Sequence, residues 1–147
     1  RIIDYFYKCQ ASARGTELHE FAAQCIRLKQ KLPKAKKTLN MYVNDALGYQ
    51  MTAEQVLYYS ENCFGTADAI SFNSRKKELR IHDLKTGTSV THIEQLYVYA
   101  AYFCLEYKYK PSQIDIELRI YQSNQCLVYV PDPVEIDDII KKITFYI

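Results

Sequence analysis

Apolar residues recur at helical spacing near the start of the chain. Leucine, phenylalanine, alanine, cysteine and leucine occupy positions 18, 21, 22, 25 and 28, which is typical of an amphipathic helix. Glu17 and Glu20 suit the positive end of a helix dipole. The pattern predicts a helix over about 16–31, which Pro33 and the lysines around it end.

The period changes in the middle of the chain. A shorter helix is expected over 38–47, capped by Thr38 and stopped by Gly48. Three strand-like segments follow, and the last two are joined by the turn-like "NSRKK". These predicted strands cover residues 54–61, 64–72 and 78–85.

The residue pattern over 92–145 predicts a helix, two strands and a further helix. The segment 92–107 is rich in Ala, Leu and aromatic residues, which favours a helix. Residues 114–121 and 125–130 are expected to pair as strands around "SNQ", and a helix is expected over 135–145. Residues 1–147 are therefore predicted to form one α/β or α+β domain with a central mixed sheet flanked by helices.

Composition agrees with an intracellular globular domain. With 147 residues, 48% of them hydrophobic and 24% charged, the chain is large enough for a real core. It lacks an apolar run of 18 residues and a signal-peptide pattern, so no membrane association is expected. The five cysteines are scattered without a CxxC pair, which favours free thiols in a reducing, cytoplasmic compartment. The chain begins with Arg1 rather than Met, so its boundaries stay open.

Charge is small in total but unevenly distributed. The formal net charge is +2, yet residues 27–37 contain six basic residues and no acid. A second basic run lies at 75–80, and acids gather at 132–138. Such runs are commonly solvated faces, and the alternative is a surface that faces phosphates. The lysines proposed for that surface are Lys29, Lys31, Lys34, Lys36 and Lys37.

Candidate chemistry lies in "IHDLKTG", residues 81–87. Because residues two apart in a strand share a face, Asp83 and Lys85 are expected to project the same way. Asp68 lies on the preceding strand and comes beside Asp83 if these two strands pair, and Gly65 permits a close backbone approach there. Two facing carboxylates repel each other, and a bound divalent cation relieves that repulsion.

Each of these residues also has an ordinary structural interpretation. A D-x-K tripeptide alone is commonly a surface ion pair, although acids within apolar strands need a partner. Gln95, Tyr99 and Tyr102 form a polar and aromatic stripe on the predicted helix, which is commonly the edge of a core. His19 lies beside the apolar stripe of the first helix, where a lone histidine is more often structural than a ligand.

These motifs, taken in order, resemble the PD-(D/E)XK nuclease superfamily and its RecB-like and phage-type exonucleases. "GTELHEF" looks like the first-helix motif with its histidine, "GTADAI" like the second motif, "HDLKTG" like the third and "QLYVY" like the Q-x-x-x-Y motif. The proline of the family name is Ala67 here. The implied fold is restriction-endonuclease-like, with αβββαβ order, which agrees with the element order predicted from periodicity.

The resemblance implies roles for individual residues. His19, Asp68, Asp83 and the carbonyl of Leu84 would bind one or two Mg²⁺ or Mn²⁺ ions, with Glu20 as an extra ligand. Lys85 would act on the attacking water or the phosphate, and Gln95 and Tyr99 would position the reacting groups. No iron–sulfur cluster is expected, because Cys126 is the only cysteine late in the chain.

The implied function is metal-dependent hydrolysis of DNA, as an exonuclease in recombination, repair or phage replication. The expected partner is DNA, with a homo-oligomer or a larger recombination or replication complex left open, and the host cytoplasm is the expected location for a phage protein. Two alternatives remain: a structure- or site-specific endonuclease on the same fold, and a non-catalytic nucleic-acid-binding domain.

Overall fold

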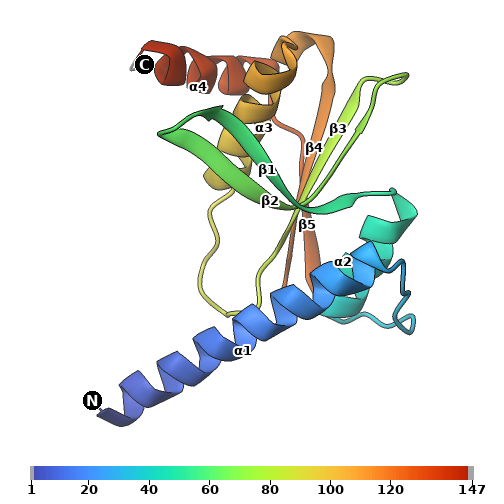
Figure 1. Ribbon diagram of the computed structural model, residues 1–147, viewed down its shortest axis with the longest axis vertical. Helices are drawn as coiled ribbons and strands as arrows, with labels where there is room; N and C mark the ends of the chain where they lie inside the picture. The colour runs from blue at the N-terminus through green and yellow to red at the C-terminus, as the bar shows by residue number, and fades with distance from the viewer. Residues whose placement is uncertain (1, 146–147) are drawn as a thin grey trace.

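The computed structural model describes the backbone of residues 2–145 and the side chains of residues 15–145. It has an α+β fold in which helices flank a five-stranded mixed sheet (Figure 1). The predicted class and order of elements are confirmed. In chain order the elements are α1 (Ile2–Arg27), α2 (Thr38–Gly48), β1 (Thr52–Ser60), β2 (Cys63–Asn73), β3 (Glu78–Leu84), α3 (Glu94–Tyr107), the short 3₁₀ helix η1 (Pro111–Gln113), β4 (Asp115–Gln122), β5 (Gln125–Tyr129) and α4 (Pro133–Phe145).

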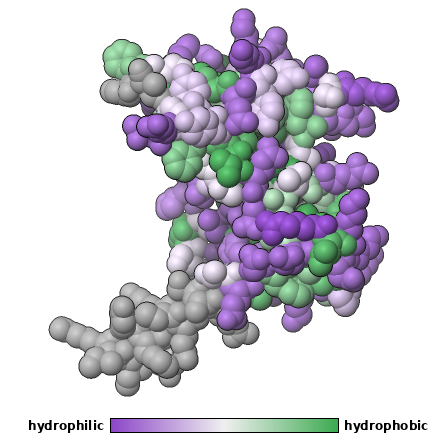
Figure 2. All heavy atoms as spheres, viewed as in Figure 1, coloured by the Kyte–Doolittle hydropathy of each residue, from purple (hydrophilic) through white to green (hydrophobic). Residues whose placement is uncertain are grey.

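The sheet has the strand order β1-β2-β3-β4-β5. Only β3 and β4 run parallel, and α3 makes the crossover between them. α3 and α4 cover one face, where the core includes Ile81, Leu96 and Leu118. α1 and α2 cover the other, around Tyr42, Val43 and Tyr121. The face seen in Figure 2 is mainly hydrophilic, with small separate apolar areas.

Part-way along β1 and β2, the apolar side chains switch from one face of the sheet to the other. Ala53 and Ala69 pack in the core under α1 and α2, whereas Leu57 and Ala67 pack in the core under α3. Simple alternation would place Ala53 and Leu57 on the same face. Between them Glu54 adopts a left-handed backbone with φ 52°, which is uncommon for a residue other than glycine. The two strands therefore twist sharply beside Asp68.

Most predicted boundaries are confirmed within two residues, and the first helix is the main exception. α1 begins at Ile2 rather than near residue 16, and it ends at Arg27 rather than 31. Lys29 ends the helix by taking a left-handed conformation with φ 55°, while the Gln30 N–H donates to the Cys25 carbonyl at 2.8 Å. A helix can thus end without glycine when this hydrogen bond closes its last turn.

The predicted cap of the second helix is wrong. The N-cap of α2 is Lys37, and Thr38 is the first helical residue. The Thr38 hydroxyl instead accepts the backbone N–H of Asn124 at 2.7 Å, which ties α2 to the β4–β5 turn. The helix does end at Gly48, and the left-handed residue after it is Gln50.

Two further findings concern membrane-spanning helices and cysteine pairing. No helix among the described residues is both long and apolar enough to cross a bilayer. Cys25, Cys63, Cys104 and Cys126 are free thiols, and the side chain of Cys9 lies outside the described residues.

Candidate functional site

Asp83 and Lys85 project from the same face at the end of β3, as predicted. The Lys85 ammonium lies 3.0 Å from Asp83 Oδ2. Asp83 is only 5% exposed, so its charge needs a partner, and Lys85 supplies one. The Lys85 N–H donates to the Tyr121 carbonyl at 2.9 Å, which continues the pairing with β4 one residue past β3.

Strand pairing brings Asp68 beside Asp83. β2 and β3 are antiparallel with Ala69 opposite His82, which makes Asp68 and Asp83 neighbours. Asp68 Oδ2 accepts the backbone N–H of Leu84 at 2.9 Å. Burial, followed by the negative charge of Asp83, raises the pKa of Asp68 to about 7, although the Leu84 N–H acts in the opposite direction. A cation placed here would relieve both causes of the shift.

His19 reaches the same point from α1. Its Nδ1 lies 2.8 Å from the Gly15 carbonyl, and its Nε2 lies 2.6 Å from the Leu84 carbonyl and 3.7 Å from Asp68 Oδ2. A neutral imidazole can donate to only one of the two carbonyls. If Nδ1 donates to Gly15, the Nε2 lone pair is left beside the Leu84 carbonyl, and a cation bound by both atoms would remove their repulsion.

Gly15 allows α1 to approach β3 closely. A Cβ at this position would lie 2.8 Å from the Thr86 hydroxyl, which is closer than real Cβ contacts come. Glycine therefore lets the helix lie against the loop that follows β3. The imidazole of His19, one helical turn later, consequently lies over Leu84.

Gln95 and Tyr99 face the carboxylates from α3. The Gln95 side-chain amide donates to the Tyr99 hydroxyl at 3.0 Å. Burial, then the charges of Asp83 and Asp68, raises the pKa of Tyr99. The close approach expected at Gly65 is present, but the group that approaches is the Tyr99 ring, because a Cβ on Gly65 would clash with it.

A pocket of about 500 Å³ opens between the end of β3 and the start of α3. Residues from four elements line it, namely His19 of α1, Leu84 of β3, Gln95 of α3 and Gln122 of β4, together with Lys85 just past β3. Its remaining walls are largely the loop at residues 86–92. The Lys85 ammonium, paired to Asp83 on one side, thus borders an open space at the end of β3.

The donors fit a hard divalent cation. Carboxylate and carbonyl oxygens suit Mg²⁺, and an imidazole nitrogen makes Mn²⁺ acceptable as well. Within residues 15–145, no three His, Cys, Asp or Glu side chains already form a complete metal-binding group. Asp83 Oδ2 is instead close to Lys85, so a cation would bind the other carboxylate oxygen or displace this ammonium.

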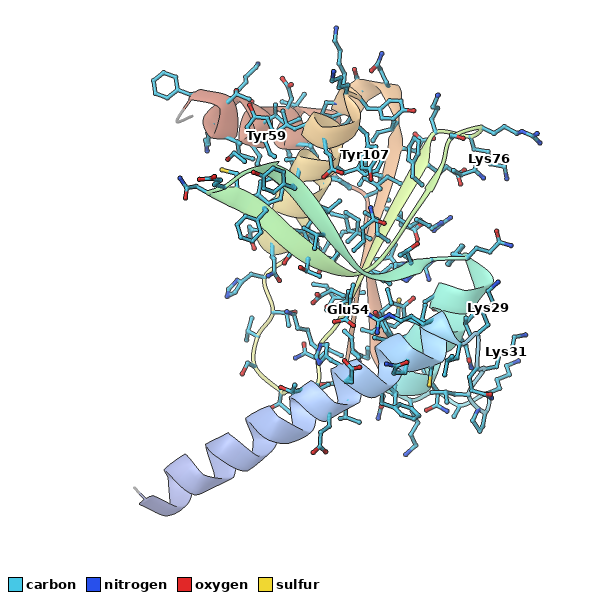
Figure 3. The ribbon with its side chains drawn as sticks, viewed as in Figure 1. Lys29, Lys31, Glu54, Tyr59, Lys76 and Tyr107 are labelled. Carbon is cyan, nitrogen blue, oxygen red and sulfur yellow. The ribbon has the colours of Figure 1, made fainter. Side chains whose placement is uncertain are left out.

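Glu20 and the basic segment lie outside this cluster. Glu20 is exposed and accepts a hydrogen bond from Gln24 at 3.2 Å, and it lines neither this pocket nor the cavity described below. The lysines of 29–37 follow the C-terminal end of α1. Figure 3 shows Lys29 and Lys31 on the side of the molecule away from the loop between β3 and α3.

The sequence interpretation missed two residues that face Asp68. Glu54 of β1 and Tyr42 of α2 line one small cavity together with Asp68 and His19. Glu54 stood in a predicted strand antiparallel to that of Asp68, so the strand register could have revealed it. Tyr42 gives no such signal, because only the packing of α2 on the sheet brings it there.

No model of a known protein family matches the chain, and no curated protein matches it either.

Proposed function

We propose that the protein is a metal-dependent DNA nuclease with a restriction-endonuclease-like core and that it acts as an exonuclease. The observation that carries this proposal is the pairing of Asp68 with Asp83 at the end of β3. The two carboxylates lie beside a histidine nitrogen and a backbone carbonyl, and Lys85 follows directly. This combination supports metal-assisted phosphodiester hydrolysis better than it supports a structural ion pair.

The residues would divide the work by position. His19, Asp68, Asp83 and the Leu84 carbonyl would hold Mg²⁺ or Mn²⁺, which lowers the pKa of a bound water and polarises a phosphate. Lys85 borders the pocket, so its ammonium can offset the charge that grows on the phosphate during attack. Gln95 and Tyr99 hold each other by a hydrogen bond and would orient the substrate strand or Lys85.

A DNA substrate is supported by charge rather than by base-reading features. Lysines of the segment 29–37 are exposed, and such residues contact phosphates without regard to sequence. Because Lys29 and Lys31 lie away from the pocket, a DNA strand would have to pass along the α1 side of the molecule to contact both. Because phosphate contacts carry no sequence information, little base specificity is expected.

The test is digestion of end-labelled linear DNA and of covalently closed circular DNA, with Mg²⁺, Mn²⁺ or a chelator. The parent is compared with Lys85→Ala and with Lys76→Ala, a matched control in the exposed β2–β3 turn (Figure 3). We expect metal-dependent loss of linear DNA that Lys85→Ala reduces roughly 100-fold and Lys76→Ala leaves within threefold.

Other outcomes separate the alternatives. Cutting of circular DNA would identify an endonuclease. If no metal gives Lys85-dependent cleavage, the catalytic proposal fails. DNA binding measured by fluorescence anisotropy would then decide whether the protein is a nucleic-acid-binding domain.

A further inference from the structure

The last part of β2, residues 71–73, is an open edge of the sheet. β1 pairs with β2 only as far as Thr52, which lies opposite Ile70, and the chain before Thr52 belongs to the turn that follows α2. β3 continues beside β2 as far as Asn73, so residues 71–73 have a neighbouring strand on one side only. Figure 1 shows β2 and β3 running on together to their turn, away from the segment that joins α2 to β1.

The backbone of this stretch is available for pairing. Its N–H and C=O groups that point away from β3 have no backbone partner within residues 15–145. Farther along this side of the sheet a side chain takes that role, since the Glu106 carboxylate accepts the Tyr58 N–H at 2.7 Å. Exposed edges are usually protected by charged residues or proline, whereas residues 71–73 are Ser, Phe and Asn. The open stretch can therefore receive a further strand.

A pocket of about 530 Å³ lies along this stretch and is called the edge pocket below. Residues 71–74 line it, with Tyr107 of α3 on one face of the sheet and Tyr49, directly after α2, on the other. Both tyrosines are accessible, at 46% and 37% exposure. The Gln55 amide donates to the Tyr107 hydroxyl at 3.4 Å, and the Arg80 guanidinium lies 3.9 Å from the centre of the Tyr49 ring. An added strand would place alternate side chains against the two tyrosines.

The charges at the end of the edge pocket are positive. No charged side chain lines the pocket itself, but Ser74 leads from it into the β2–β3 turn, where Arg75 and Lys76 are exposed. Figure 3 shows Lys76 at the tip of this turn, directed away from the sheet. A phosphate-bearing ligand would meet no cation within the pocket, and a second copy of the chain would bring its own basic turn. An extended segment with acidic residues at its ends matches both the backbone edge and this charge.

We propose that the edge pocket binds an extended segment of a partner protein, which adds as a strand beside residues 71–73 and places acidic residues next to Arg75 and Lys76. Backbone hydrogen bonds supply the pairing, and the two tyrosines contact alternate side chains. None of the residues that line the edge pocket belongs to the candidate metal site, so the inference does not depend on the proposed function.

The probe is a fluorescein-labelled heptapeptide with the sequence Val-Thr-Val between two glutamates at each end. Fluorescence anisotropy compares it with the same peptide carrying lysines instead of glutamates, and we expect the glutamate peptide to bind at least about tenfold more tightly. Lys76→Glu should weaken its binding by about three- to tenfold. Lys142→Glu, a matched control on the exposed side of α4, should leave it within about twofold. Thermal unfolding checks that both variants are folded.

Two further measurements test whether the peptide adds as a strand. N-methylation of its three central residues removes their N–H donors and keeps its charges, so we expect binding to weaken about tenfold or more. At a saturating concentration the unmethylated peptide should slow hydrogen exchange of at least one backbone amide within residues 71–73 by about tenfold or more.

No saturable binding of the glutamate peptide below about 1 mM would overturn the proposal, and so would equal affinity for the N-methylated peptide. Slower exchange at residues 71–73 with oligothymidylate and no peptide would assign the edge pocket to a nucleic acid instead. Slower exchange that depends only on protein concentration would assign it to a second copy. Each of these results would leave the proposed nuclease activity standing, because digestion of DNA is measured separately.

Discussion

Two charged clusters on the same sheet differ in how their charges are balanced. In the first, Arg80 and Arg119 share Glu117, with 2.7 Å between Arg119 Nε and Glu117 Oε1, and Arg119 also lies 3.5 Å from Asp45. Tyr121 donates to Asp45 at 2.6 Å. Two positive groups therefore meet two negative ones.

The cluster around Asp68 and Asp83 has no such balance. Three carboxylates gather near Tyr42, and the cations paired with them lie at the edges, Arg27 on Glu54 and Lys85 on Asp83. The consequence is the pKa of Asp68, raised to about 7. In a balanced cluster each charge has a partner within the protein. In an unbalanced cluster the unpaired charge lowers the stability of the fold unless a ligand offsets it.

The largest expected effect separates the two clusters by activity. Asp83→Asn removes a proposed metal ligand, so we expect cleavage to fall about 1,000-fold. Asp45→Asn removes a carboxylate from the balanced cluster and should leave cleavage within threefold. Single-turnover digestion of end-labelled DNA at saturating Mn²⁺ measures both. Equal losses in the two variants would mean that the clusters do not differ in function.

For stability we expect the opposite: a substitution in the balanced cluster should lower the free energy of unfolding and leave metal binding unchanged. Glu117→Gln leaves two guanidinium groups with one carboxylate, which should lower the free energy of unfolding by about 1–3 kcal/mol. Mn²⁺ affinity should stay unchanged, because Glu117 lines neither the pocket nor the cavity. Urea unfolding and calorimetry measure the two quantities, and a weaker Mn²⁺ affinity would contradict the separation.

A buried histidine within the balanced cluster sets its acid sensitivity. His82 is fully buried, and neither ring nitrogen has a hydrogen-bond partner within residues 15–145, while Tyr49 and Tyr121 contact its ring. Burial, then the charges of Arg119 and Arg80, lowers the pKa of His82 to about 3.

Between pH 6.5 and about 3 the unfolded state therefore binds a proton that the folded state does not. Stability should fall as the pH falls through this window. His82→Phe should remove about 1–3 kcal/mol of that fall between pH 7 and 4. Urea unfolding across this range tests the difference, and parallel curves for parent and variant would contradict it.

The smallest effect concerns Asp68 without metal. Because its pKa is raised from 3.8 to about 7, the folded state keeps a proton that the unfolded state has lost, so stability falls as the pH rises through this window. Asp68→Asn should remove this fall and gain about 1–2 kcal/mol over the parent at pH 8 in chelator. Mn²⁺ should stabilise the parent alone. A variant less stable than the parent at pH 8 in chelator would show that the carboxylates do not repel.

The predictions from sequence succeeded where a local rule governs the outcome. Asp83 and Lys85 share a face because side chains alternate along a strand, and their 3.0 Å contact confirms this. Pairing of two neighbouring strands by a short turn placed Asp68 beside Asp83. By contrast, the Thr38 cap was wrong, because a residue 86 positions away in the chain competes for its hydroxyl.

Local patterns along the chain specify the order of helices and strands, the two acids and the lysine, and the residue types available to bind a cation. The tertiary structure alone decided that Tyr42 faces Asp68, because that depends on how α2 packs on the sheet, and it added the sharp twist at Glu54. It also separated the balanced cluster from the unbalanced one. Charges interact through space, and only the fold determines which of them lie within a few ångströms of each other.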